Sequence, residues 1–272
     1  MWGWGGDMRH LSLFSGIGGL DLAAEWAGME TVGQCEFADY PTKILEKHWP
    51  NVPRWRDVRG VTAESVKAKC GTVDIISGGF PCQPHSLAGL RKASEDERDL
   101  WGEYARIVRE VKPRWVVAEN VSGLLSSDNG RFFPRVLRDL AINGYCVEWH
   151  SLPAAAFGST HFRDRVFLLA FDSNRINDRT IKTNKGFQQA TESSRMYRPI
   201  LRAEWEVDTC SGRPTITTKN RQYFDCEPGV DRVSYGTPNR SHRLRSLGNM
   251  VVPQQAYPIF KAIMDIERGV IT

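Results

Sequence analysis

Short apolar runs alternate with amphipathic stretches from residue 8 to residue 171. The apolar runs predict six strands, at His10–Phe14, Thr31–Glu36, Val73–Ser77, Trp115–Ala118, Tyr145–Leu152 and Val166–Phe171. Apolar positions at helical spacing predict helices at Leu20–Ala27, Ala38–His48, Leu100–Val111 and Phe132–Ile142. Strands that alternate with helices are typical of an α/β fold, in which a parallel sheet is joined by crossover helices on both faces.

The pattern changes after Phe171. Residues 172–242 are polar and rich in Arg, Asn, Thr and Ser, and only short β-like pieces such as Pro214–Thr218 interrupt them. The chain becomes apolar again over Leu244–Ile266. We therefore expect one large domain, made of residues 1–171 and 243–272, and a small irregular domain of residues 172–242. A domain of that size is marginal alone and is expected to lean on the large one.

Composition narrows the class of protein further. Of the 272 residues, 41% are hydrophobic and 25% are charged, which is usual for a globular chain. The longest apolar runs are far shorter than the roughly 18 residues of a membrane span, and the first ten residues do not resemble a signal peptide. The six cysteines include no C-x-x-C pair, so we expect neither a metal site nor a disulfide framework. These features favour the cytoplasm.

The net charge of +4 is concentrated in the polar segment. Residues 172–245 contain 14 basic and 9 acidic residues, whereas the rest of the chain contains 22 and 23. Such asymmetry is compatible with a surface that faces a polyanion, and equally with an ordinary solvated loop region.

A glycine-rich turn follows the first predicted strand, in the sequence LFSGIGG that ends at Gly19. The third glycine of the dinucleotide fingerprint G-x-G-x-x-G is replaced by Asp21, so the NAD pattern fails. Glu36 ends the second strand, where a carboxylate can accept hydrogen bonds from ribose hydroxyls, and Phe37 and Asp57 could meet an adenine ring and its amino group. These residues favour a nucleoside cofactor without a pyrophosphate.

Three further motifs stand at predicted strand ends, where ligands bind in such sheets. The sequence GGFPCQP places Cys82 on a turn governed by glycine and proline, and a thiolate is a strong nucleophile near neutral pH. Glu119 follows a buried strand, and a partly buried carboxyl group there can act as an acid. Arg163 and Arg165 lie on one side if their segment is extended, where they could bind an oxygen or anion, or could pair with Asp164.

A last motif, LGNMVVP at residues 247–253, reads as a turn that leads into an apolar strand or helix. The sequence resembles the DNA (cytosine-5)-methyltransferase family, in particular its compact, phage-like bacterial members. The resemblance rests on seven features in the same order along the chain: FSGIGG, Glu36, Asp57, GGFPCQ, ENV, R-x-R and GNMVVP. The resemblance covers residues 11–171 and 243–266. It implies a Rossmann-like S-adenosylmethionine-dependent methyltransferase domain with a small target-recognition domain, which accept duplex DNA between them.

The resemblance also implies a role for each matching residue. Glu36 would bind the ribose of S-adenosylmethionine, Asp57 would meet the adenine amino group, and Asn249 would help to close the pocket. The adenine would lie between Phe37 and Val58. The methionine half of the cofactor would contact the first turn, through Phe14, Gly16, Ile17, Gly18 and Gly19.

For catalysis, the resemblance makes Cys82 the nucleophile that attacks C6 of a flipped cytosine, with Glu119 at N3 and the amino group of the base. Arg165 would reach the cytosine O2, and Arg163 would lie near the thiol and the DNA backbone. Residues 83–99 would form a mobile loop that carries Ser86 over the base. DNA contacts in the small domain are expected from Arg213, Lys219 and Arg221, with Asn220 and Gln222 as further candidates by type and location.

The sequence departs from the family pattern in three places. His161 replaces the usual glutamine before the R-x-R motif, and His85 stands where many members have an aromatic residue. The usual segment that supports the recognition domain, R-L-x-P-x-E followed by R-L-Q-G-F-P, is absent, and only Arg243–Leu247 precedes the Gly-Asn motif. These departures concern how DNA is read more than they concern the methyl transfer.

Two other functions share these motifs. A silent DNA-binding relative would have no chemical need for Cys82, and a tRNA-methylating branch of the family carries a C-F-T stretch that is not found here. The leading hypothesis is therefore a DNA (cytosine-5)-methyltransferase that modifies a short duplex sequence, for restriction-modification or protection of phage or host DNA. We expect it to act as a monomer, and a cognate restriction endonuclease would not be physically required.

Overall fold

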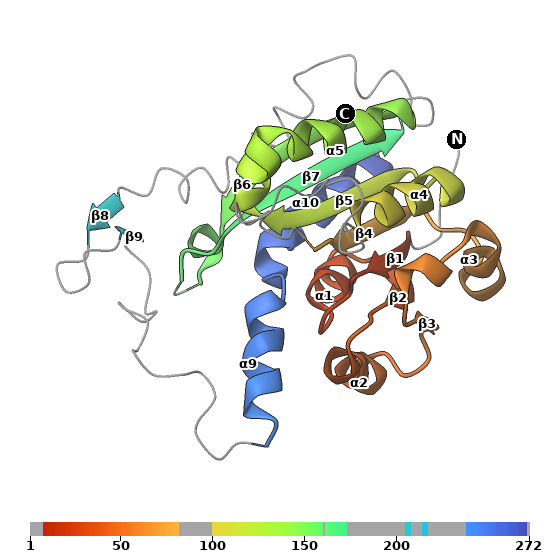
Figure 1. Ribbon diagram of the computed structural model, residues 1–272, viewed down its shortest axis with the longest axis horizontal. Coiled ribbons are helices and arrows are strands. Elements are labelled where there is room, and N and C mark those ends of the chain that lie inside the picture. The colour runs from red at the N-terminus through yellow and green to blue at the C-terminus, as the bar shows by residue number, and fades with distance from the viewer. Residues whose placement is uncertain are drawn as a thin grey trace.

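The computed structural model describes residues 8–81, 100–159, 161–172, 205–207, 214–216 and 238–270. One seven-stranded sheet organises the larger part of this chain, in the order β3-β2-β1-β4-β5-β7-β6 (Figure 1). Its strands are β1 (Arg9–Leu13), β2 (Glu30–Cys35), β3 (Arg54–Trp55), β4 (Ile75–Gly79), β5 (Trp115–Val121), β6 (Tyr145–Pro153) and β7 (Asp164–Asp172). A separate pair, β8 (Trp205–Val207) and β9 (Pro214–Ile216), is antiparallel.

Helices connect these strands and follow the last of them. The α-helices are α1 (Gly19–Trp26), α2 (Asp39–His48), α3 (Ala63–Cys70), α4 (Trp101–Val111), α5 (Phe132–Ile142), α9 (Arg240–Asn249) and α10 (Pro253–Glu267). Shorter 3-10 segments are η1 (Val58–Gly60), η3 (Ser122–Gly130) and η4 (Ala154–Phe157). None of the helices in the described part of the chain is long and apolar enough to cross a membrane.

The sheet separates two hydrophobic layers, because successive side chains of a strand point to opposite faces. In β4, for example, Ile76 packs with the layer that includes α3, α4 and α5, whereas Ile75 packs with the layer formed by α1 and α10. Figure 1 shows α10 crossing behind the sheet beside α1. The expected α/β fold with helices on both faces is confirmed, and all six predicted strands and four predicted helices are present, with shifted ends in all but α5.

The sheet is not wholly parallel, which corrects the sequence-based expectation. β7 runs antiparallel to both of its neighbours, β5 and β6, whereas the pairs from β3 to β5 are parallel. Only ten residues, including η4, separate the end of β6 from the start of β7. A parallel crossover needs a dozen or more residues, so this connection closes a hairpin instead.

Several elements of the described chain were not predicted, among them β3, η1 and α3. β3 has two residues, too few for a visible period. The start of α3 carries a signal, because Thr62 accepts a hydrogen bond from the Ser65 N–H while the Ser65 hydroxyl accepts one from the Thr62 N–H. This reciprocal pattern is a capping box with serine at its third position.

Candidate active site

The glycine-rich turn connects β1 directly to α1. Phe14, Gly16 and Gly18 have positive φ angles of 52°, 56° and 92°, so the chain reverses tightly before the helix begins at Gly19. A Cβ atom on Gly19 would lie 2.3 Å from the carbonyl oxygen of Val251, so only glycine allows α1 to pack this closely on the LGNMVVP segment. The turn thus joins the first and last motifs of the chain, and its residue Ile17 is half-buried beside them.

Glu36 connects this turn to the segment that follows β2. Its Oε2 accepts a hydrogen bond of 2.8 Å from the Gly16 N–H, and its Oε1 accepts one of 2.8 Å from the Ala38 N–H. Each carboxylate oxygen has two acceptor sites, so both can still accept a ligand hydroxyl. A carboxylate is therefore fixed at the carboxyl end of the sheet, next to the glycine-rich turn.

Phe37 and Asp57 lie at the same edge of the sheet as Glu36. The Phe37 side chain is 75% exposed, which leaves its ring free to stack on a planar ligand, whereas Val58 belongs to the hydrophobic core. Asp57 accepts a hydrogen bond of 2.9 Å from the Arg59 N–H and so caps η1. Its carboxylate is half-exposed and can accept from a further donor.

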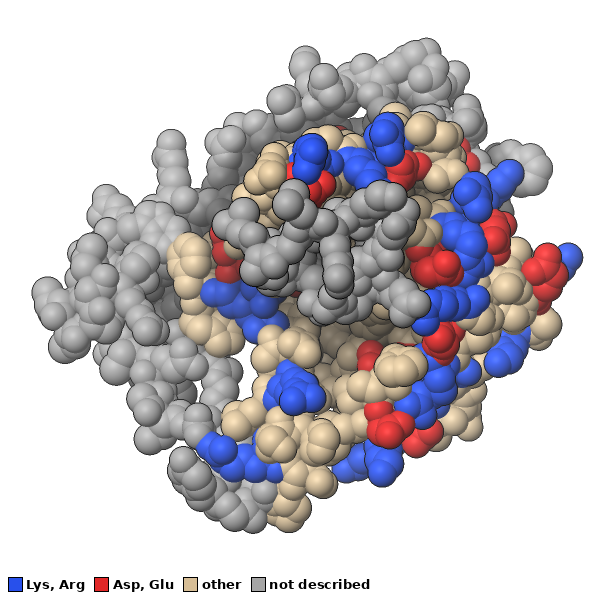
Figure 2. Space-filling view, in the orientation of Figure 1, with Lys and Arg blue, Asp and Glu red and all other residues tan. Residues whose placement is uncertain are grey.

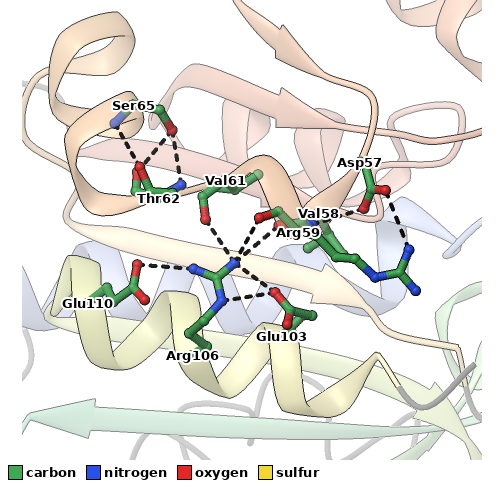
Figure 3. A network of polar contacts seen from close by, with 9 residues as sticks. All are labelled: Asp57, Val58, Arg59, Val61, Thr62, Ser65, Glu103, Arg106 and Glu110. Carbon is green, nitrogen blue, oxygen red and sulfur yellow. Dashed lines mark hydrogen bonds and ion pairs between the residues drawn. The ribbon is translucent and has the colours of Figure 1, made fainter. Parts of the chain in front are cut away.

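Arg106 fixes this segment from the other side, a role that the sequence analysis missed. From α4, its guanidinium donates to the carbonyl oxygens of Val58, Arg59 and Val61, at 3.4, 3.5 and 3.0 Å (Figure 3). It also pairs with two carboxylates of its own helix, those of Glu103 and Glu110. The helical spacing of these two acidic residues around an arginine was visible in the sequence, but the carbonyl partners lie 45 to 48 positions away.

The end of β4 is held in place by the neighbouring strand. The side-chain amide of Asn120, in β5, donates a hydrogen bond of 2.9 Å to the carbonyl oxygen of Phe80, and the Phe80 ring is buried against Trp101. Pro81 is the last described residue here, and Cys82 follows it in the sequence. Asn120 therefore fixes the backbone two residues before the predicted nucleophile.

Glu119 lies beside this strand end, in register with Gly79. A Cβ atom on Gly79 would lie 2.9 Å from Oε2 of Glu119, so glycine leaves the space that the carboxyl group occupies. Glu119 is 7% exposed, and burial raises its pKa to about 7 against the opposing effect of Arg165 and Arg163. Arg165, on β7, pairs with it at 3.0 Å between Nε and Oε1. A carboxyl group that changes protonation state near neutral pH thus faces the strand that leads to Cys82.

The two arginines of the R-x-R motif take different directions. Arg163 has a φ angle of 37° and lies before β7 begins, so the segment is not extended at this residue. The expectation that both arginine side chains lie on the same side of an extended segment is therefore wrong. Its guanidinium donates to the carbonyl oxygens of Gly248, at 2.8 Å, and Met250. Arg165 approaches Glu119, and it donates to the backbone carbonyl of Asp164.

The LGNMVVP segment has a different local structure from the expected turn. Gly248 and Asn249 form the last turn of α9, and the helix α10 begins at Pro253. Asn249 is exposed at the end of α9, next to the carbonyl groups that Arg163 binds. His161, the departure from the family pattern, contacts the hydroxyl of Ser159 at 2.8 Å through Nδ1.

The remaining predicted site residues lie outside the described residues: Cys82, Ser86, Arg213, Lys219 and Arg221, together with the predicted loop 83–99. The described residues bring together the predicted cofactor residues at one edge of the sheet and Glu119 with Arg165 at the next strand ends. No group of three or more His, Cys, Asp or Glu side chains that could hold a metal is found within the described ranges.

Comparison with known proteins assigns the chain to a family. The family model for C-5 cytosine-specific DNA methylase matches residues 8–227. The chain is 29% identical to the type II methyltransferase M.HhaI of Haemophilus parahaemolyticus over 253 residues, which cover 92% of this chain and 74% of that protein. It is 33% identical to the type II methyltransferase M.HgiCII of Herpetosiphon aurantiacus, over 97% of this chain and 54% of the relative.

The fold has a counterpart among solved structures. A protein assigned as a DNA modification methyltransferase, encoded within a prophage of Escherichia coli, superposes with a TM-score of 0.65 over 96% of this chain and 100% of the other, at 19% identity. That likeness concerns the fold, whereas the family model spans residues 8–227, most of the chain. The chain belongs to the C-5 cytosine-specific DNA methylase family.

Proposed function

We propose that this protein is a DNA (cytosine-5)-methyltransferase, which moves a methyl group from S-adenosylmethionine to C5 of a flipped cytosine through a covalent bond between Cys82 and C6. The observation that carries the proposal is the buried pair of Glu119 and Arg165 beside the strand end that leads to Cys82. A DNA-binding module would gain nothing from a carboxyl group with a pKa near 7 at this place.

The residues at the sheet edge fit S-adenosylmethionine. Glu36 presents a fixed carboxylate to the ribose, Phe37 presents an exposed ring to the adenine, and Asp57 presents an acceptor to its amino group. We assign the backbone of the turn around Gly16, where φ is positive, to the methionine half of the cofactor. When bound, the cofactor supplies an electrophilic methyl group. Gly19 packs against Met250 and Val251, which directly follow Asn249, and we assign to Asn249 a part in enclosing the cofactor.

Glu119 supports the attack on the cytosine ring. C5 of cytosine is a weak nucleophile, and addition of the Cys82 thiolate to C6 converts the ring into an enamine that is nucleophilic at C5. The attack moves electron density onto N3, so a protonated Glu119 stabilises the adduct by donating a hydrogen bond to that nitrogen. We assign to Arg165, which pairs with Glu119, the donation of a hydrogen bond to the O2 oxygen of the same base.

The later steps return the thiol to its starting state. C5 would take the methyl group as the bond between that group and the cofactor sulfur breaks, with its electron pair left on sulfur. Solvent water would then accept the proton on C5, and the electron pair of that C–H bond would expel the thiolate from C6. Nearby positive charge favours the thiolate form of a cysteine. Arg163 and Arg165 are the cations of the R-x-R motif that we assign to this task.

The substrate base must leave the DNA stack before C6 can be attacked, at a cost of a few kcal/mol. We assign closure over the flipped base to residues 83–99, with Ser86 in contact with DNA, and sequence reading to residues 172–242. Phosphate contacts by the basic residues of that segment should make binding strongly dependent on salt, and Arg213, Lys219 and Arg221 are the proposed DNA-binding side chains.

The described chain contributes a further basic surface. Arg240, Arg243 and Arg245 lie on α9, and no acidic residue occurs between residues 232 and 264. In Figure 2, basic side chains lie at the lower left, where Figure 1 draws α9, whereas basic and acidic side chains alternate at the opposite edge. Such a surface is suited to a polyanion.

We infer that the protein acts on duplex DNA as a monomer in the cytoplasm, with no requirement for a bound endonuclease.

The test is base-resolution mapping of 5-methylcytosine in mixed-sequence duplex DNA after incubation with the protein and S-adenosylmethionine. We expect methylation confined to one short motif, and none with Cys82→Ala. The matched control is Cys146→Ala, which removes an exposed thiol on β6 and should leave the pattern unchanged. DNA binding without methylation in any context would favour a silent relative, and preferential methylation of tRNA in a competition assay would replace the DNA substrate.

A further inference from the structure

A buried polar chain lies beneath the predicted cofactor residues and contains none of them. The carboxylate of Asp21, on α1, is fully buried. Its Oδ2 accepts a hydrogen bond of 2.9 Å from the Ser12 hydroxyl, and its Oδ1 accepts one of 2.8 Å from the Gln34 side-chain amide. The Oε1 atom of Gln34 in turn accepts a hydrogen bond of 2.9 Å from Nε of Arg54.

The chain ends on the backbone of α2. Arg54 also donates to the carbonyl oxygen of Leu45, at 2.8 Å, and to that of Trp49. The Trp49 ring lies against Gly18, where a Cβ atom would be 2.5 Å from it. The polar chain therefore begins beside the glycine-rich turn at Ser12 and returns to that turn through Trp49.

Each member lies within three residues of a predicted cofactor contact. Asp21 follows Gly19 by two residues, Gln34 precedes Glu36 by two, and Arg54 precedes Asp57 by three. These three contacts follow β1, β2 and β3, so they belong to three different strand ends. A shift of one strand or of α1 would change their mutual distances, and a ligand that binds all three would lose contacts.

We propose that Asp21, Gln34 and Arg54 form a positioning network that sets the spacing of the three cofactor-binding segments. None of the three touches the cofactor in this assignment; they act through Gly18, Glu36 and Asp57. The inference rests on the proposed use of S-adenosylmethionine. Each contact in this buried network needs a donor and an acceptor at hydrogen-bond distance, whereas apolar packing is non-directional. The network therefore fixes the relative positions of the three segments more narrowly than apolar packing of the same area would.

The directions of the hydrogen bonds provide a sharp test. Gln34→Glu keeps the shape of the side chain and its contact with Arg54, but it places an oxygen where the amide donated to Asp21. Two carboxylates then face each other in a buried site, which is strongly unfavourable. Adding Asp21→Asn restores the contact, because the new amide can donate to the new carboxylate while its oxygen still accepts from Ser12.

The experiment measures the dissociation constants of S-adenosylmethionine and S-adenosylhomocysteine by calorimetry, with single-turnover methylation of DNA at saturating cofactor. We expect Gln34→Glu to weaken cofactor binding at least tenfold with the saturated rate within about twofold of the wild type, since 1.4 kcal/mol of lost positioning corresponds to a factor of ten. The double variant should recover most of the affinity, and Asp21→Asn alone should change it little because its amide can rotate.

Thr31→Val is the matched control. Thr31 is a buried polar residue of the same strand, and its hydroxyl contacts His10 rather than the network. We expect this variant to lose stability with unchanged cofactor affinity. If Gln34→Glu does not fold, Arg54→Lys replaces it, because a single ammonium cannot serve Gln34 and both carbonyl groups at once, and a tenfold weaker affinity is again expected.

Three results have different meanings. A Gln34→Glu variant that melts at lower temperature but binds cofactor like the wild type would overturn the positioning role, as would a double variant no better than the single one. If Arg54→Lys is used instead, wild-type affinity in that variant would overturn it equally. A wild type that binds neither cofactor form would refute the proposed function instead.

Discussion

Protonation of Glu119 should set the alkaline limit of methyl transfer. Burial raises the pKa of this carboxyl group from 4.5 to about 7, while Arg165 and Arg163 act in the opposite direction. A carboxyl group with a pKa of 7 is about half protonated at pH 7, whereas one with a pKa of 4.5 is protonated in about one molecule in 300. Burial therefore increases the population that can donate to the cytosine by about 150-fold.

The expected pH dependence follows from that population. Above pH 7 the protonated fraction falls, and it approaches a tenfold decrease for each further pH unit, so the rate of the chemical step should fall by about tenfold between pH 8 and pH 9. Single-turnover methylation with the DNA and the cofactor bound beforehand isolates this step from product release, which limits many enzymes. Rapid quenching between pH 6 and pH 9.5 gives the profile.

Two variants identify the group responsible. Arg165→Met removes a cation that lowers the pKa of Glu119, so the alkaline limb should move to higher pH, whatever the absolute rate. Arg165→Lys keeps a cation and should move the limb less. Glu119→Gln should be slower than the wild type and lack the limb entirely. A wild-type rate that is constant from pH 7 to pH 9, or a limb that Arg165→Met leaves in place, would refute the assignment of the acid.

Three further changes test other parts of the structure. Gly79→Ala places a methyl group 2.9 Å from Glu119 Oε2, and we expect a single-turnover rate reduced about tenfold with unchanged cofactor affinity. Burial lowers the pKa of His10 from 6.5 to about 3, so below pH 6.5 the unfolded chain takes up a proton that the folded chain does not. Between pH 7 and pH 5, urea denaturation should therefore show the wild type losing about 2 kcal/mol more stability than His10→Gln, and equal losses would contradict this. Arg163→Met removes the Nη2 donor that both carbonyl groups at the end of α9 share, and urea denaturation should show a stability lower by about 1 kcal/mol; an unchanged midpoint would mean that this contact contributes nothing.

The regular part of the fold was predictable because long periodic segments carry their own signal. The α5 helix has the predicted bounds, and its buried residues recur at helical spacing. The direction of β7 was not read from its apolar run, because a buried strand looks the same whether it is parallel or antiparallel. The predicted strand ends left residues 153–165 between the two strands, enough for a crossover, and only the longer observed strands shorten the connection to a hairpin.

The residues of the candidate site were predictable where each stands alone at a strand end. Glu36 follows β2 and Glu119 lies near the end of β5, and the structure places both at the carboxyl edge of the sheet. The partners of these groups were less predictable. Arg163 donates to carbonyl oxygens 85 and 87 residues away, and a positive φ angle separates its direction from that of Arg165. Sequence spacing does not show such contacts, because every residue has a backbone carbonyl group and the residue type does not mark which of them is an acceptor.

The same limit explains why the supporting residues were not predicted. Asp21 appeared in the sequence only as the residue that breaks the G-x-G-x-x-G pattern, yet its carboxylate is the acceptor for both Ser12 and Gln34. A glycine at this position would allow close packing of helix on strand, whereas an aspartate needs donors from two strands to be buried without a large cost. The departure from the dinucleotide fingerprint is thus itself a constraint on β1 and β2. We infer that the aspartate in place of the third glycine and the buried donors around it are two parts of one arrangement. Asp21→Gly would therefore leave the Gln34 amide without its acceptor, and it would not improve the glycine-rich turn.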